Sequence, residues 1–408
     1  MFPVDPATTA TVVGYVGLGV ALGTVTGLTP GLHANAVALL LAAAAPRLPG
    51  TGLGVAAAML ATGVVHTFLD AVPALALGVP DASMAAGALP GHRLVLAGRG
   101  SEAVRLSACG SVAGVLAAVP LAVPLTRAAG TLAPRIQDAL PLVLGAVVCV
   151  LLATESSVRA AAGGAVAFAA SAALGGVVLD LSLSGPLPVG SVLAPLFAGL
   201  FGAPVLLESL RGDGGVPEQD ASSLRMGRVG LAVTAAAGAS TGAVVAYVPG
   251  VSAGVAATIA LPAAPGRHPA RGYVVASSAA NTATAVFALF ALAALDAART
   301  GVTVALREAG SPVVLPVLAA AVALAAAAGT ALVVVAGDRY LRAARRVDHG
   351  RVAVGVLALL ALLAALFGGA RGVGVYLAAS AVGLLPGRLG CRRVHLMGSL
   401  VGPLAAGL

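Results

Sequence analysis

A nine-residue stretch that ends at Asn35, GLTPGLHAN, combines helix breakers with polar side chains inside a segment free of Asp, Glu, Lys and Arg. Pro30 lacks an amide hydrogen and Gly31 destabilises helices, so a helix should end here and release backbone amides and carbonyls. His33 and Asn35 add side-chain donors directly after the break. The amides at the start of a following helix favour negative charge, so we expect an anion to bind near residues 32–35.

A second break of the same kind occurs later in the chain, within GASTGAVVAYVPGVSAGVAA (Gly238 to Ala257). This stretch aligns without gaps with GVALGTVTGLTPGLHANAVA (Gly19 to Ala38), and the alignment places two glycines and the Pro-Gly pair in register. Such matches indicate an internal duplication. Interrupted segments at corresponding positions of two halves often mark the binding site of a transporter.

We therefore predict that the two breaks together form one substrate site near the middle of the membrane. Its expected residues are Pro30, Gly31, His33 and Asn35 from the first half and Pro249, Gly250 and Ser252 from the second. Because Thr11 to Ala44 and Arg228 to Ala264 are too long for one ordinary span, each should form a re-entrant hairpin of two short arms. A simpler interpretation keeps the breaks as kinks, with Asn35 and Ser252 capping the released backbone groups.

The stretch HTFLD places an ionisable pair inside another apolar run. His66 and Asp70 are four residues apart and therefore share one face of a helix. An acid at membrane depth is costly and suggests a function, here the binding of a coupling proton or cation. In the second half, Asn281 and Thr282 occupy a comparable place and offer oxygens to Na⁺ or to the substrate. Polar packing between helices is the alternative for all four residues.

These residues must be positioned by membrane helices. The 408 residues are 59% hydrophobic and only 9% charged, with a mean hydropathy of +1.03, whereas soluble domains carry about a quarter charged residues. Apolar runs recur along the whole chain. Since a span needs ~20 residues, we predict an all-α polytopic fold of roughly ten to twelve membrane segments, in contact with the lipid of the cell membrane.

The most polar internal connection, residues 211–228, predicts a boundary between two halves. We expect an N-terminal repeat half at 1–210, a connecting loop at 211–228 and a C-terminal repeat half at 229–408. A later loop, DRYLRAARRVDHGR, has five Arg against two Asp and should lie in the cytoplasm. The net charge of +8 comes mostly from arginines in such short connections, which argues against a nucleic-acid partner.

Motifs for several kinds of chemistry do not occur in the sequence. A phosphate-binding G-x-x-x-x-G-K-[ST] loop is excluded because the chain has no lysine, and the HExxH motif does not occur either. Cys109, Cys149 and Cys391 are scattered, unlike a metal site or a disulfide framework. We therefore expect no catalytic residues, no bound metal and no cofactor beyond a coupling Na⁺ or H⁺, and thus no enzyme.

Three stretches carry a resemblance to a known family. GLTPGLHAN, LGVPDASMAAGALPGHRLVLAGRG (Leu77 to Gly100) and GASTGAVVAYVPGVSAG resemble the large membrane subunit of tripartite tricarboxylate transporters, the TctA family. The resemblance spans most of the chain and places the family's conserved turns at Pro30, Gly31, Asn35, Gly78, Pro80, Pro249 and Gly250. His33 and the Leu-Pro-Gly-His-Arg stretch depart from the usual pattern and indicate a divergent, archaeal type of branch. The resemblance implies two partners, a small membrane subunit and an extracytoplasmic binding protein.

Residues and resemblance together predict a secondary transporter, or permease, of small organic anions, here di- or tricarboxylates, driven by a Na⁺ or H⁺ gradient. The alternative function is a translocase of polyprenyl phosphate or another anionic lipid, because some such families also use paired Pro-Gly turns.

Overall fold

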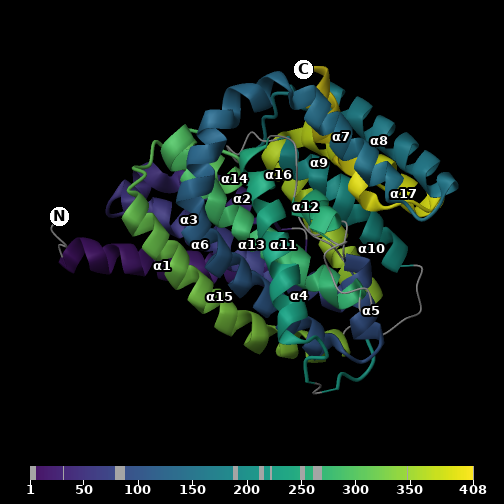
Figure 1. The fold of residues 1–408 in the computed structure, drawn as a ribbon, viewed down its shortest axis with the longest axis horizontal. Coiled ribbons are helices and arrows are strands. Elements are labelled where there is room, and N and C mark those ends of the chain that lie inside the picture. Colours follow the sequence, from purple (N-terminus) through teal and green to yellow (C-terminus); the bar gives the residue numbers. More distant parts are fainter. Residues whose placement is uncertain are drawn as a thin grey trace.

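The computed structural model describes residues 6–30, 32–78, 88–186, 192–210, 216–220, 223–248, 253–260, 269–346 and 348–407, and within them the regular secondary structure is entirely helical (Figure 1). This confirms the predicted all-α fold. The first half contains α1 (Pro6–Leu28), α2 (Ala34–Ala44), η1 (Ala45–Arg47), α3 (Gly52–Leu69), α4 (Ala71–Leu77), α5 (Ala88–Leu96), α6 (Gly100–Asp138), α7 (Leu140–Ala153), α8 (Val158–Val178), α9 (Leu193–Phe197), η2 (Ala198–Gly202) and α10 (Ala203–Ser209). The second contains α11 (Arg228–Tyr247), α12 (Ala253–Ala260), α13 (Pro269–Leu295), α14 (Gly301–Glu308), α15 (Leu315–Ala344), α16 (His349–Gly383), α17 (Leu385–Leu389), η4 (Arg393–Met397) and α18 (Gly398–Ala406).

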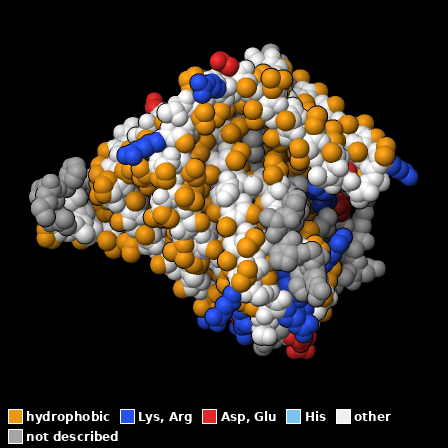
Figure 2. Space-filling model, viewed as in Figure 1, with side chains coloured by type: hydrophobic (Ala, Val, Ile, Leu, Met, Phe, Trp, Pro, Cys, Tyr) orange, Lys and Arg blue, Asp and Glu red, His pale blue; other side chains and the backbone are white. Residues whose placement is uncertain are grey.

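Eight helices in the described part of the chain are long and apolar enough to cross a membrane. They are α1, α3 continued by α4, α6, α8, α11, α13, α15 and α16 continued by α17. Three further apolar segments, Ala34–Arg47, Leu140–Ala153 and Leu193–Glu208, are shorter than a full span. Apolar side chains cover most of the face in Figure 2, and arginines gather at its lower edge. This distribution is that of a multi-pass membrane protein.

Both predicted helix breaks exist, between α1 and α2 and between α11 and α12. The expectation of two short arms is wrong in one respect. The helices before the breaks, α1 and α11, have 23 and 20 residues, and at 1.5 Å per residue each is about 30 Å or longer, enough for a full span. Only the helices after the breaks are short, with 11 and 8 residues. The first arm is longer than expected because α1 already begins at Pro6, a residue that suits the first helical turn.

Glycines at equivalent positions let α1 and α11, the two spanning helices that precede the breaks, pack closely on their neighbours. A Cβ on Gly23 of α1 would lie 2.6 Å from the carbonyl oxygen of Thr62 on α3. A Cβ on Gly242 of α11 would lie 2.6 Å from the carbonyl oxygen of Ala280 on α13. Small residues therefore allow close helix packing at matching places of the aligned segments. The division of the chain at 211–228 stays a prediction.

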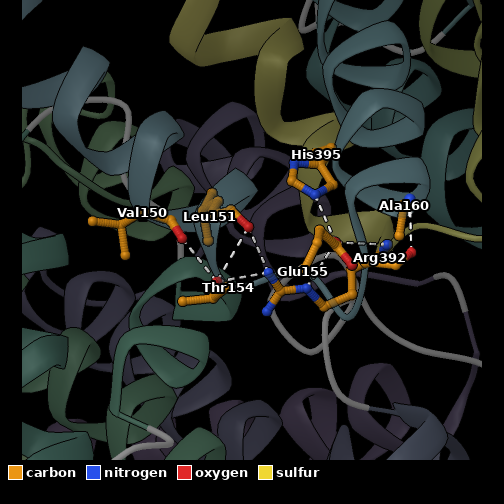
Figure 3. A network of polar contacts seen from close by, with 8 residues as sticks. Val150, Leu151, Thr154, Glu155, Ala160, Arg392 and His395 are labelled. Atoms are coloured by element: carbon orange, nitrogen blue, oxygen red, sulfur yellow. Dashed lines mark hydrogen bonds and ion pairs between the residues drawn. The ribbon is translucent and has the colours of Figure 1, made fainter.

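A buried ion-pair network ties the C-terminal segment to the turn between α7 and α8 (Figure 3). Glu155 accepts hydrogen bonds from Arg392 Nε at 2.9 Å and from His395 Nε2 at 2.8 Å. The Arg392 guanidinium also donates to the Leu151 carbonyl oxygen at 2.6 Å and to the Thr154 hydroxyl at 2.8 Å. These bonds hold η4 and α18 against α7 and α8, and thereby position two residues of the site described next.

Candidate functional site

A cavity of about 950 Å³ lies where α2, α3, α13 and α14 meet α9, η2, α16 and α18. This volume is at the upper end of the range for small-molecule sites. The polar residues that line it are His33, Asn35, His66, Thr67, Asn281, Thr284, Arg299, Thr300, Thr303 and Glu308. Residues that the sequence predicted in separate halves therefore line one cavity: His33, Asn35 and His66 from the first half, and Asn281 from the second.

The first break places His33 and Asn35 at the wall of the cavity. His33 caps α2, since its ring Nδ1 accepts a hydrogen bond of 3.1 Å from the Asn35 amide. The Leu32 amide donates to the Thr29 carbonyl oxygen at 3.2 Å. Two of the amides expected to be free at this break therefore already have acceptors, and the capping side chain is His33 rather than Asn35. The side chain of Asn35 makes no hydrogen bond within the described residues.

The rings of His33 and His66 bring the first helix break into contact with residues 66–70 of the first half. Their ring centroids are 4.8 Å apart, with an interplanar angle of 49°. His66 is buried, and its Nδ1 lies 3.1 Å from the hydroxyl of Thr26 on α1. The first break is therefore in direct contact with the polar pair that the sequence predicted on α3.

Three of the four predicted coupling residues, Asp70, Asn281 and Thr282, take part in one buried contact between α13 and the C-terminal end of α3. Asn281 Nδ2 donates to Asp70 Oδ2 at 2.7 Å, and the hydroxyls of Thr67 and Thr282 lie 3.2 Å apart. All four side chains are buried. Asn281 and Thr67 line the cavity, whereas Asp70 and Thr282 do not, so the acid is one hydrogen bond away from the cavity wall.

The start of α14 is a part of the site that the sequence analysis missed. Thr300 and Thr303 form a capping box, in which the Thr303 amide donates to the Thr300 hydroxyl at 3.2 Å and the Thr300 amide donates to the Thr303 hydroxyl at 2.9 Å. Gly301 packs directly on Asn35, where a Cβ would collide with the amide side chain. The first turns of α2 and α14 are therefore neighbours at the cavity.

Arg299 precedes α14 and is the only basic residue, histidine aside, among the described residues that line the cavity. Arg299 is exposed to solvent; partial burial lowers its pKa, but an arginine keeps its charge in proteins. The loop that carries it turns at Asp296, whose φ of 49° is tolerated by aspartate. At the other end of α14, Glu308 is the only acid in the described lining. The sequence signal for this part was RTGVT, an arginine directly before a threonine-capped helix.

Several predicted residues lie outside the described part of the chain: Gly31, Pro249, Gly250, Ser252 and the turn residue Pro80. Pro30 is described and buried at the end of α1. The helices on both sides of the second break are also in place. Val245 of α11 lines the cavity, and Val255 of α12 is fully buried. Gly78 ends α4 with a φ of 68°, the left-handed conformation that favours glycine.

Comparison with known proteins decides the family. Residues 13–398 match the model of the tripartite tricarboxylate transporter TctA family. The chain belongs to this TctA family. Over 202 residues it is also 31% identical to an uncharacterized protein of Methanocaldococcus jannaschii. That match covers 48% of this chain and 48% of the relative, so it spans about half the length of the curated relative. No solved structure matches the chain.

Membership of the TctA family confirms the resemblance found in the sequence, and the archaeal relative agrees with an archaeal type of branch. The matched region contains both helix breaks and every residue that the sequence analysis assigned to the site. The TctA chain is thus a multi-pass membrane component of a transporter family. Within its described residues, no three His, Cys, Asp or Glu side chains are grouped as a metal site.

Proposed function

We propose that this TctA chain carries carboxylate anions across the membrane and that the anion occupies the cavity at the first turns of α2 and α14. The observation that carries the proposal is the convergence of both halves on this cavity. Asn35, a turn residue of the family, lines it beside His33, and Asn281 reaches it from the second half. Broken helices that meet at a cavity between two repeats are the usual construction of a secondary transporter's site.

The driving force in this proposal is a Na⁺ or H⁺ gradient that acts through His66, Asp70, Asn281 and Thr282. Buried carboxylate, amide and hydroxyl oxygens are suitable ligands for Na⁺, and the neighbouring His33 and His66 rings are suitable proton acceptors. The hydrogen bond from Asn281 to Asp70 connects these groups to the cavity wall. Cation binding and anion binding can therefore influence each other over a short distance.

The proposed system has two further components, a small membrane subunit and an extracytoplasmic binding protein that delivers the anion. This part of the proposal rests on the family name, which describes a tripartite transporter. Co-purification of the chain with the products of neighbouring genes would test it, and transport by the chain alone in liposomes would contradict it.

A thermal-shift experiment on the purified chain tests the transport proposal. A ligand that binds only the folded protein raises its stability, so a substrate carboxylate should raise the melting temperature. Screening mono-, di- and tricarboxylates with and without Na⁺, at several pH values, also reports the coupling ion. Stabilisation by polyprenyl phosphate alone would contradict the proposal in favour of lipid translocation. Uptake of the stabilising anion by proteoliposomes that contain the chain together with both partner proteins should then depend on the same cation.

A further inference from the structure

We infer that the cavity is built for a monocarboxylate with an apolar body, and that Arg299 and Asn35 bind its carboxylate. This inference deepens the proposed function and rests on it. It differs from the tricarboxylate in the family name, and it assigns Arg299 as a residue that determines specificity.

The charges of the cavity fit one carboxylate. In the described lining, Arg299 and Glu308 are the only Arg and acidic residues, and they lie at opposite ends of α14, so their formal charges cancel. Burying a charge is costly unless it is paired. One bound carboxylate can pair with Arg299, whereas the second and third carboxylates of a tricarboxylate would meet no further guanidinium and would add to the charge of Glu308.

The hydrogen-bond donors of the cavity also fit one carboxylate. Thr67, Thr284 and Thr303 each donate their hydroxyl hydrogen to a backbone carbonyl oxygen, at 2.8, 2.7 and 2.9 Å. A hydroxyl has a single hydrogen, so these side chains cannot also solvate an anion without giving up a bond. The Asn281 amide already donates to Asp70 at 2.7 Å. Most polar side chains of the lining thus bond to the protein itself.

Arg299 and Asn35 are different, because both keep donors available. The Arg299 amide donates to the Thr303 hydroxyl at 3.0 Å, but its guanidinium makes no hydrogen bond or ion pair within the described residues. The half-buried Asn35 side chain rests on Gly301, two residues after Arg299. Both side chains therefore flank the first turn of α14. A guanidinium binds a carboxylate with two parallel hydrogen bonds, and the neighbouring amide can add a third.

Much of the remaining described lining is apolar and comes from the distant residues 179–181, 192–202, 360–367 and 397–400. Its larger side chains include Phe197, Phe201, Leu363, Phe367 and Met397. Such a surface gains from covering an apolar group and offers nothing to a second polar end. An aromatic or aliphatic body attached to one carboxylate satisfies both parts of the cavity.

Ligand binding to the full chain in lipid nanodiscs tests this inference directly. Phenylacetate should raise the melting temperature, and its Kd from calorimetry should be at least about tenfold lower than that of succinate or citrate. Phenylacetamide has the same body without the charge and should bind at least about tenfold more weakly than phenylacetate. Equal binding of the amide would overturn the inference, because it would show apolar binding without recognition of the anion.

Two variants with matched controls locate the two ends of the ligand. Arg299→Gln should weaken phenylacetate binding about tenfold or more, while Arg307→Gln, on the exposed side of α14, should leave it unchanged. Leu363→Ala should weaken phenylacetate more than acetate, and Leu362→Ala, the exposed neighbour, should affect neither. Unchanged phenylacetate binding by folded Arg299→Gln would remove Arg299 from the site.

The outcomes separate this inference from the proposed function. Citrate binding more tightly than phenylacetate would overturn the monocarboxylate inference and support the carboxylate transporter. Binding of neither anion, in a protein that a thermal melt shows to be folded, would overturn both.

Discussion

Asn281 on α13 donates a hydrogen bond of 2.7 Å to Asp70 at the end of α3, and this contact joins the two halves of the chain beside the cavity. Both side chains are buried, with 8% and 2% of their surface exposed. An amide oxygen accepts a hydrogen bond as a carboxylate oxygen does. An asparagine at position 70 would therefore remove the charge of Asp70 and keep an acceptor for the hydrogen bond from Asn281.

Asp70→Asn should keep the fold and change the dependence of anion uptake on Na⁺ or pH, because it removes the charge and retains an acceptor for Asn281. Asp70→Ala should lower the stability by about 1–3 kcal/mol, because it leaves a buried donor unsatisfied. Uptake into proteoliposomes that contain the chain with both partner proteins, at varied Na⁺ and pH, measures the first effect, and thermal melts measure the second. Unaltered ion dependence in Asp70→Asn would assign Asp70 a structural role only.

Gly301→Ala should weaken anion binding about tenfold, since the added methyl group would occupy the space of the Asn35 side chain and displace it from the start of α14. Gly355→Ala on α16 is the matched control, because a Cβ there has nothing within 4 Å. Calorimetry with the best carboxylate gives the comparison. Equal Kd values for the two variants would show that Asn35 does not contact the anion.

Gly23→Ala should destabilise the protein by about 1–3 kcal/mol, because its Cβ would lie 2.6 Å from the Thr62 carbonyl oxygen and would push α1 away from α3. Gly17→Ala, on the same helix with nothing within 4 Å, should raise the stability by about 0.5–1 kcal/mol through helix propensity. Thermal melts in one detergent measure both changes. A Gly23→Ala protein as stable as Gly17→Ala would contradict the close packing of α1 on α3.

Glu102→Gln should destabilise the chain by about 3–5 kcal/mol, because Glu102 is the carboxylate that Arg99 and Arg271 share. Its side chain is 0% exposed and accepts from Arg99 Nε at 2.6 Å and Arg271 Nε at 2.9 Å. Asp348→Asn removes the charge of an exposed pair with Arg351 and should cost less than about 1 kcal/mol. Similar melting temperatures for the two variants would be inconsistent with a buried ion cluster at Glu102.

Stability should fall as the pH drops below about 6.5 because of His395. Burial lowers the pKa of His395 below its usual 6.5, and the hydrogen bond to Glu155 offsets this only in part. The folded protein therefore disfavours the protonated ring, while the unfolded chain takes up the proton. The stabilisation is complete above pH 6.5 and is lost as the pH falls toward the lower, folded pKa.

Glu155 keeps its charge throughout this pH window. Its burial raises the pKa, but the hydrogen bonds from Arg392 and His395 outweigh burial and hold the pKa below 4.5. Melts between about pH 5 and 7.5 should therefore show a slope that His395→Gln removes, because glutamine can donate to Glu155 without titrating. The same slope in His395→Gln would assign the pH dependence to another group.

Local rules placed the helix breaks in the sequence. Pro and Gly interrupt a helix wherever they occur, so the ends of α1 and α11 and the short helices that follow were predictable, as was the shared face of His66 and Asp70. The full-length α1 was missed, because propensity marks an end more sharply than a start in a uniformly apolar run. The prediction that the first break leaves free amides was only partly correct, because the His33 ring accepts a hydrogen bond from the Asn35 amide.

Tertiary structure alone decided which apolar residues line the cavity and which charged residue joins them. In a membrane protein, apolar side chains face both lipid and protein, so hydropathy does not distinguish the cavity-lining Leu363 from the exposed Leu362. Arg299 has the sequence context of many loop arginines. It becomes a site residue because Gly301 allows α14 to pack on Asn35, more than 260 residues earlier in the chain. The sequence determined the helices and their interruptions through short-range backbone physics, and long-range packing assembled the site.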